Sequence, residues 1–154
     1  MRCIPPLSER VRPVSRRSLL LRMAYHPLPR WAAALAWTVL VCLLMLLPGK
    51  DSVAEDVSGF FGGTDMTDAC GHVLLFSIFT ALWYAVLACY LAPAQALRRA
   101  LAIGAACGLL LELGQGIVPH RGLSLLDFTA NALGALVSFA ALRTRVGRLL
   151  APPR

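Results

Sequence analysis

Six polar side chains lie within strongly apolar stretches of this 154-residue chain, at spacings that could support chemistry. They form three pairs: Asp68 with His72, Glu112 with Gln115, and Asp127 with Asn131. Members of a pair are three or four residues apart, so each pair shares one face if the chain is helical there. Carboxylates and an imidazole exchange protons in general acid–base catalysis. A nearby arginine, Arg121, is the kind of group that holds a phosphate or carboxylate.

Four long apolar blocks would position these side chains: residues 31–47, 69–91, 100–118 and 123–142. The chain is 58% hydrophobic with a mean hydropathy of +0.67, which is high for a soluble domain of this size. A helix of about 20 residues crosses a hydrocarbon core about 30 Å thick. The blocks are long and do not alternate in polarity, which favours helices over strands. The sequence therefore predicts an all-α integral membrane protein, built as a four-helix transmembrane bundle.

The basic residues predict the orientation of this bundle. Of 15 basic residues, 13 precede the first block, separate the second from the third, or follow the fourth; only Lys50 and Arg121 lie in the other two connections. The positive-inside rule then places both termini in the cytoplasm. Because these charges sit at block ends rather than along one face, they argue against a nucleic-acid partner. The arginine-rich, lysine-poor composition favours a bacterial source, so we expect a multi-pass protein of the cytoplasmic (inner) membrane.

This pattern divides the chain into a basic N-terminal segment (1–30), a four-helix membrane domain (31–142) and a basic cytoplasmic tail (143–154). The first segment leaves three alternatives open: a twin-arginine export signal, a first block that is a cleaved signal peptide, and translation from Met23 instead of Met1. The five cysteines include no Cys-x-x-Cys pair, which argues against a disulfide framework or a cysteine zinc site. The sequence does not indicate an oligomeric state.

A short connection at 119–122, Pro-His-Arg-Gly, joins the third and fourth blocks. A loop of this length makes its two helices antiparallel neighbours. Glu112 and Asp127 would then lie roughly 9 and 6 Å below the outer membrane boundary, at 1.5 Å per residue. We therefore expect one outward-facing polar layer, with Arg121 directly above it. Its expected members are Asp68, His72, Glu112, Gln115, Asp127 and Asn131.

These residues carry a resemblance to a known family. The pattern Asp68-x-x-x-His72, Glu112-x-x-Gln115, Pro119-x-Arg121 and Asp127-x-x-x-Asn131-x-x-Gly134 resembles the VanZ-like family. That family consists of small bacterial membrane proteins named after a teicoplanin-resistance protein. The resemblance covers about residues 31–142 and is most specific over 112–134. Ala69 stands where the family usually has a lysine, so the role of that lysine is lost here or falls to Arg121. The resemblance implies a role at the cell envelope and an effect on glycopeptide (teicoplanin) sensitivity.

We expect the polar layer to act on, or bind, a lipid-linked or cell-envelope component, and whether it does so as an enzyme stays open. The candidate catalytic residues are Glu112, His72 and Asp127. The candidate binding residues are Asp68, Gln115, Arg121 and Asn131. The alternative is a purely structural polar network in a small membrane scaffold or interaction protein without catalysis. Interhelical polar contacts average only about 0.6 kcal/mol, whereas a charged residue at the membrane centre costs about 2.5–3.5 kcal/mol on insertion scales.

The expected partners are the lipid bilayer and a lipid-linked envelope precursor. No cofactor and no metal site are predicted, because the sequence contains no His-Glu-x-x-His or similar motif. One histidine among three carboxylates leaves a divalent cation as a lesser alternative. Proton or ion movement is a further alternative, although no ionisable residue continues the polar layer into the cytoplasmic half of the last three blocks.

Overall fold

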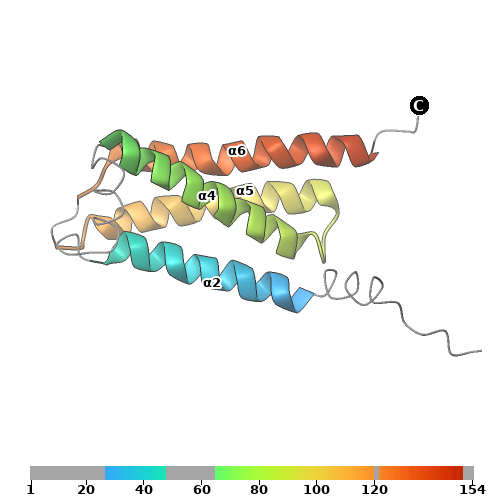
Figure 1. The fold of residues 1–154 in the computed structure, drawn as a ribbon, viewed down its shortest axis with the longest axis horizontal. Helices are drawn as coiled ribbons and strands as arrows, with labels where there is room; N and C mark the ends of the chain where they lie inside the picture. The colour runs from blue at the N-terminus through green and yellow to red at the C-terminus, as the bar shows by residue number, and fades with distance from the viewer. Residues whose placement is uncertain (1–26, 48–64, 120–121, 151–154) are drawn as a thin grey trace, which may run out of the picture.

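The computed structural model describes residues 27–47, 65–119 and 122–150, and within these ranges every regular element is an α-helix (Figure 1). Helix α2 spans Pro27–Leu46, α4 spans Asp65–Leu87, α5 spans Pro93–Gln115 and α6 spans Leu125–Leu150. The predicted four helices and the all-α class are therefore confirmed for the described part of the chain. The N-terminal alternatives and Arg121 lie outside the described residues.

The helices alternate in direction along one bundle, so that α4 and α6 begin at the end where α2 and α5 finish (Figure 1). α6 packs against both α4 and α5, and α2 packs against α4 and α5 from the other side. The connection between α4 and α5 is short, which makes these two helices antiparallel neighbours as well. The helical region is longer than the predicted domain 31–142, because α2 begins at Pro27 and α6 continues to Leu150. Arginines favour the helical state, so α6 does not stop where its apolar block ends.

Three helices are long and apolar enough to cross a membrane: Pro27–Leu46, Met66–Leu87 and Leu125–Arg145. Helix α5 has a similar length, but it is not among the three. It carries four strongly polar side chains: Arg98, Arg99, Glu112 and Gln115. Large apolar side chains cover the outside of the bundle, including Leu74, Leu110 and Leu133, each more than half exposed. An outer surface of this kind is typical of helices that face lipid.

A small apolar core joins α2, α4 and α5. Val41, Met45, Phe76 and Leu111 form this buried cluster. Next to it, glycines let the helices approach closely: a Cβ added at Gly104 would overlap the hydroxyl of Thr80 on α4, and one at Gly134 would overlap the backbone carbonyl of Val73. Small residues at such contacts are typical of helix pairs in membranes.

The described charges are divided between the two ends of the bundle. The arginines gather where α2 and α5 begin and α6 ends; they include Arg30, Arg98, Arg99, Arg143 and Arg145. Asp68, Glu112 and Asp127 lie at the opposite end, where α4 and α6 begin and α5 finishes. The acidic end is where the sequence predicts the polar layer.

Candidate functional site

A hydrogen bond between α4 and α6 forms the centre of the site. Nδ1 of His72 lies 2.9 Å from Oδ1 of Asn131, and the two residues are only 6% and 1% exposed. Because an amide oxygen only accepts, Nδ1 carries the proton in this assigned orientation of the amide. Two glycines allow the close approach: Gly108 of α5 lies against Asn131, and Gly134 of α6 lies against α4. The helix packing and the polar contact therefore depend on each other.

Two carboxylates surround the other side of the His72 ring. Nε2 of His72 lies 4.0 Å from Oδ1 of Asp127. A ring nitrogen of His72 and one oxygen each from Asp68 and Asp127 all lie within 4.8 Å of one another. Exposure increases outward, since His72 is buried, Asp127 is half-buried and Asp68 is exposed. Both aspartates lie in the first turn of their helices, where the helix dipole favours negative charge.

Ser124 fixes the start of α6. Its hydroxyl accepts a hydrogen bond from the backbone N–H of Asp127 at 3.2 Å, and its carbonyl accepts the first helical bond, from Phe128 N at 3.0 Å. Ser124 is therefore the N-cap of α6. In a capping box, the acidic side chain three residues after the cap residue would accept a hydrogen bond from the backbone N–H of the cap residue. Here that N–H goes to Oε1 of Glu112 instead, at 2.6 Å, and Asp127 remains directed to His72.

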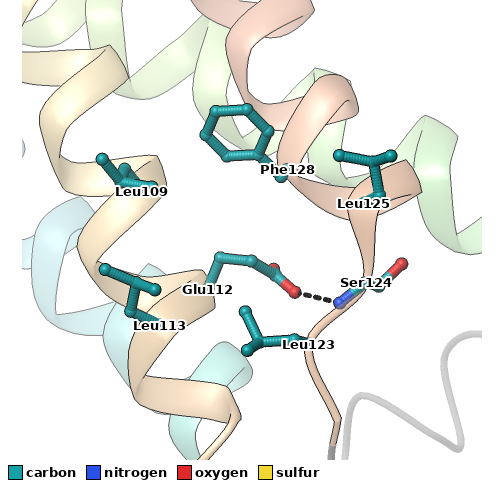
Figure 2. A pocket seen from close by; sticks show the side chains of 7 residues that line it. All are labelled: Leu109, Glu112, Leu113, Leu123, Ser124, Leu125 and Phe128. Atoms are coloured by element: carbon teal, nitrogen blue, oxygen red, sulfur yellow. Dashed lines mark hydrogen bonds between the residues drawn. The ribbon is translucent and has the colours of Figure 1, made fainter.

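The side chain of Glu112 reaches from α5 to Ser124 at the start of α6 and forms part of the lining of a surface groove (Figure 2). The groove has a volume of about 320 Å³, and its walls are Leu109, Leu113, Leu123, Leu125 and Phe128, with Glu112 and Ser124 completing the lining. Glu112 itself is 2% exposed. Its second oxygen, Oε2, is buried and has no hydrogen-bond partner among the described residues. The lining of the groove is thus apolar except for Glu112 and Ser124, and the unpartnered Oε2 of Glu112 is buried beside it.

Gln115 belongs to a third contact, between α5 and α2. Its Nε2 donates to the backbone carbonyl of Met45 at 3.1 Å, and the side chain is 3% exposed. No hydrogen bond or ion pair within the described ranges joins Gln115 or Glu112 to His72. Gln115 therefore acts in this structure as a link between helices.

The predicted polar layer exists at one end of the bundle, but it consists of three separate contacts. His72, Asn131, Asp127 and Asp68 form one group on α4 and α6. Glu112 with Ser124, and Gln115 with Met45, form the other two. The sequence interpretation missed Ser124 and the Met45 carbonyl. The Ser-x-x-Asp pattern at 124–127, a capping-box signal, could have identified Ser124, whereas no sequence signal identifies a backbone carbonyl.

The two acidic groups differ in what they can do chemically. The His72 group brings one ring nitrogen and two carboxylates within 4.8 Å of one another, an arrangement that can hold a proton or a cation. Glu112 has one carboxyl oxygen left that can accept a hydrogen bond from a group that reaches it. Comparisons of this chain with models of known protein families, with curated proteins and with solved structures gave no match.

Proposed function

We propose that this protein binds a lipid-linked or other amphipathic component of the cell envelope at the acidic end of its helical bundle. In this proposal the apolar part of the ligand lies in the groove between α5 and α6. A hydroxyl, amine or amide of its polar part donates a hydrogen bond to Glu112. The positive-inside rule supports an outward direction for this end, because the described arginines gather at the other end.

The observation that carries the proposal is the state of the Glu112 carboxylate. One oxygen caps α6 through the N–H of Ser124, and the other is buried without a partner in the described part of the chain. Leaving a buried acceptor unsatisfied costs about 1–3 kcal/mol, and more for a charged group. A purely structural cap needs one acceptor, which glutamine would also supply. The second oxygen is therefore accounted for if a ligand donates to it.

The walls of the groove favour an amphipathic ligand over a water-soluble one. Leu109, Leu113, Leu123 and Leu125 are between 44% and 78% exposed, so the groove opens sideways onto the apolar outer surface. A ligand that enters from the lipid phase would meet apolar side chains first and the carboxylate last. The groove has a volume of about 320 Å³, which is at the lower end of the range of about 300–1,000 Å³ for ligand sites. The groove therefore fits one segment of a lipid.

The resemblance to the VanZ-like family adds a cellular expectation to this proposal. On that resemblance, expression of the protein in a glycopeptide-sensitive bacterium should raise the teicoplanin concentration needed to stop growth. If the ligand site is responsible, the Glu112→Gln variant, expressed at the same level, should not raise it.

A structural network is the second candidate function, and two contacts favour it. Glu112 bonds the start of α6, and Gln115 bonds the Met45 carbonyl on α2, so both polar side chains tie helices together. On this hypothesis, Glu112→Gln would keep the cap through its amide oxygen. The only result would then be a change in the stability of the protein, in either direction.

A matched pair of lipids tests the proposal on the purified full-length protein. Phosphatidylethanolamine and phosphatidylcholine with the same acyl chains differ in that only the former has N–H donors on its head group. We expect native mass spectrometry to show tighter binding of phosphatidylethanolamine to the wild type. In Glu112→Gln an amide N–H₂ replaces the free acceptor, so the preference should fall about tenfold, since a hydrogen bond to a charged group is worth about 1.5–3 kcal/mol.

Leu110→Ala is the control, because Leu110 is 67% exposed and is not part of the groove. It should bind both lipids as the wild type does. Equal binding of the two lipids by the wild type, or an unchanged preference in a folded Glu112→Gln variant, would refute the role proposed for Glu112.

A further inference from the structure

We propose that Asp68, His72 and Asp127 form a binding site for one divalent transition-metal cation, with His72 as the nitrogen ligand. This site is separate from the Glu112 groove and does not depend on the proposed lipid ligand. It lies where α4 and α6 begin, at the acidic end of the bundle.

Three ligand atoms come together where α4 and α6 begin. One atom from each side chain lies within 4.8 Å of the other two. Metal–ligand bonds of about 2.0–2.2 Å place neighbouring ligand atoms roughly 3–3.5 Å apart. The group therefore needs to contract by about an ångström. Asp68 is exposed and Asp127 is half-buried, so their carboxylates have space to rotate toward the ion, while the buried His72 stays in place.

The orientation of the imidazole ring also favours a cation at this point. In the tautomer in which Nδ1 of His72 donates to Oδ1 of Asn131 at 2.9 Å, Nε2 of the ring is an acceptor. This nitrogen faces Oδ1 of Asp127 at 4.0 Å, too far for a hydrogen bond. No hydrogen bond reaches Nε2 from any described residue. Two acceptors that face each other at 4.0 Å, one of them on a residue only 6% exposed, favour a shared donor or a cation between them.

Asn131 also provides what a metal-bound histidine usually has. Such histidines donate their second ring N–H to a carbonyl or carboxylate, which fixes the ring and its tautomer. Asn131 is 1% exposed, and its Cβ lies against Gly108 of α5, which places the side chain in the contact between α5 and α6. The ring is thus oriented before any ion binds.

The ligand set indicates which ions fit. Mg²⁺ and Ca²⁺ prefer oxygen ligands alone, whereas imidazole nitrogen suits Zn²⁺ and similar transition metals, and Mn²⁺ accepts carboxylates readily. One nitrogen and two carboxylates therefore favour Zn²⁺ or Mn²⁺. Three protein ligands leave at least one position of the ion for water or an anionic group. The competing explanation is a metal-free polar group in which water joins His72 to the two carboxylates.

The test uses the full-length, tag-free protein in detergent after treatment with a chelator. Zn²⁺ binding is measured by titration calorimetry. Mn²⁺ binding is measured by titration of its electron paramagnetic resonance signal. We expect one ion per chain and little response to Mg²⁺. Asp127→Asn and His72→Gln should each weaken binding at least tenfold. Asp68→Asn changes an exposed side chain and should also weaken binding while the bundle stays folded.

Two control variants separate this site from other sources of binding. His26→Gln changes a histidine outside the proposed site, and Glu112→Gln changes the buried carboxylate of the groove; both should bind the ion as the wild type does. Should Zn²⁺ and Mn²⁺ fail to bind the wild type, or bind folded Asp68→Asn and Asp127→Asn equally well, the three side chains form a metal-free polar group and the proposal is wrong. Neither result would affect the lipid test, which depends on Glu112.

Discussion

The contact between α4 and α6 at Gly134 makes a sharp prediction about what holds the site together. A Cβ added at Gly134 would lie 3.0 Å from Cβ of Phe76 and 3.1 Å from the backbone N of Ser77, and closer still to the carbonyl oxygen of Val73. Carbon–oxygen contacts of this type are usually about 3.3–3.6 Å. The obstacle is mainly backbone, which cannot rotate away as a side chain can. Gly134→Ala must therefore push the two helices apart.

The cost follows from what the separation disrupts. Overpacking of this kind costs about 1–3 kcal/mol. Two interhelical hydrogen bonds would lengthen, His72 to Asn131 and the Ser77 hydroxyl to the Gly134 carbonyl, both 2.9 Å in the structure. Each such bond is worth about 0.6 kcal/mol in a membrane protein. Alanine regains at most about 1 kcal/mol through its helix propensity. We expect a net loss of about 1–3 kcal/mol in the free energy of unfolding.

The assay is unfolding of the purified protein in detergent by increasing sodium dodecyl sulfate, followed by tryptophan fluorescence. Gly71→Ala is the matched control, because a Cβ at Gly71 meets nothing within 4 Å and the helix propensity of alanine should make that variant equally or more stable. Gly104→Ala should be intermediate, since there the nearest obstacle is the Thr80 side chain, which can shift. If Gly134→Ala were as stable as Gly71→Ala, the close packing of α4 on α6 described above would be incorrect.

Two further predictions concern the start of α6 and the orientation of the bundle. Ser124→Ala removes the hydroxyl that caps α6 and should destabilise the protein by about 1 kcal/mol, whereas Ser124→Asn should restore most of that loss; equal stability of all three proteins in the same unfolding assay would show that the cap contributes nothing. A green fluorescent protein fused after Arg154 should fluoresce, and alkaline phosphatase inserted between α5 and α6 should be active, because the positive-inside rule places these points on opposite sides. Reporters active in the reverse pattern would place the Glu112 groove on the cytoplasmic side.

The four helices could be predicted from the sequence because long apolar blocks have few other structures in lipid. Their ends could not be predicted as well, because hydropathy reports contact with lipid, whereas a helix ends where its backbone groups find other partners. The apolar block at 123–142 thus starts before Ser124, the residue that caps α6, and stops well before Leu150, where the helix ends.

Spacing alone predicted which side chains come together for His72, Asp127 and Asn131, but not for Glu112 and Gln115, which bond different helices. His72 and Asn131 do meet, and Asp127 lies beside them, as the spacing of four residues on α4 and α6 allows. The spacing did not predict that Glu112 would bond the N–H of Ser124. That contact depends on the depth and rotation of α5 against α6, which are set by packing at Gly108 and not by periodicity.

The central claim is that the acidic end of the bundle serves a ligand and is more than a structural network. Native mass spectrometry of the wild type, Glu112→Gln and Asp127→Asn in the presence of phosphatidylethanolamine and Zn²⁺ tests it most directly. We expect both adducts on the wild type, loss of the lipid alone in Glu112→Gln, and loss of the metal alone in Asp127→Asn. A wild type that carries neither adduct, beside variants that differ from it only in stability, would contradict the claim.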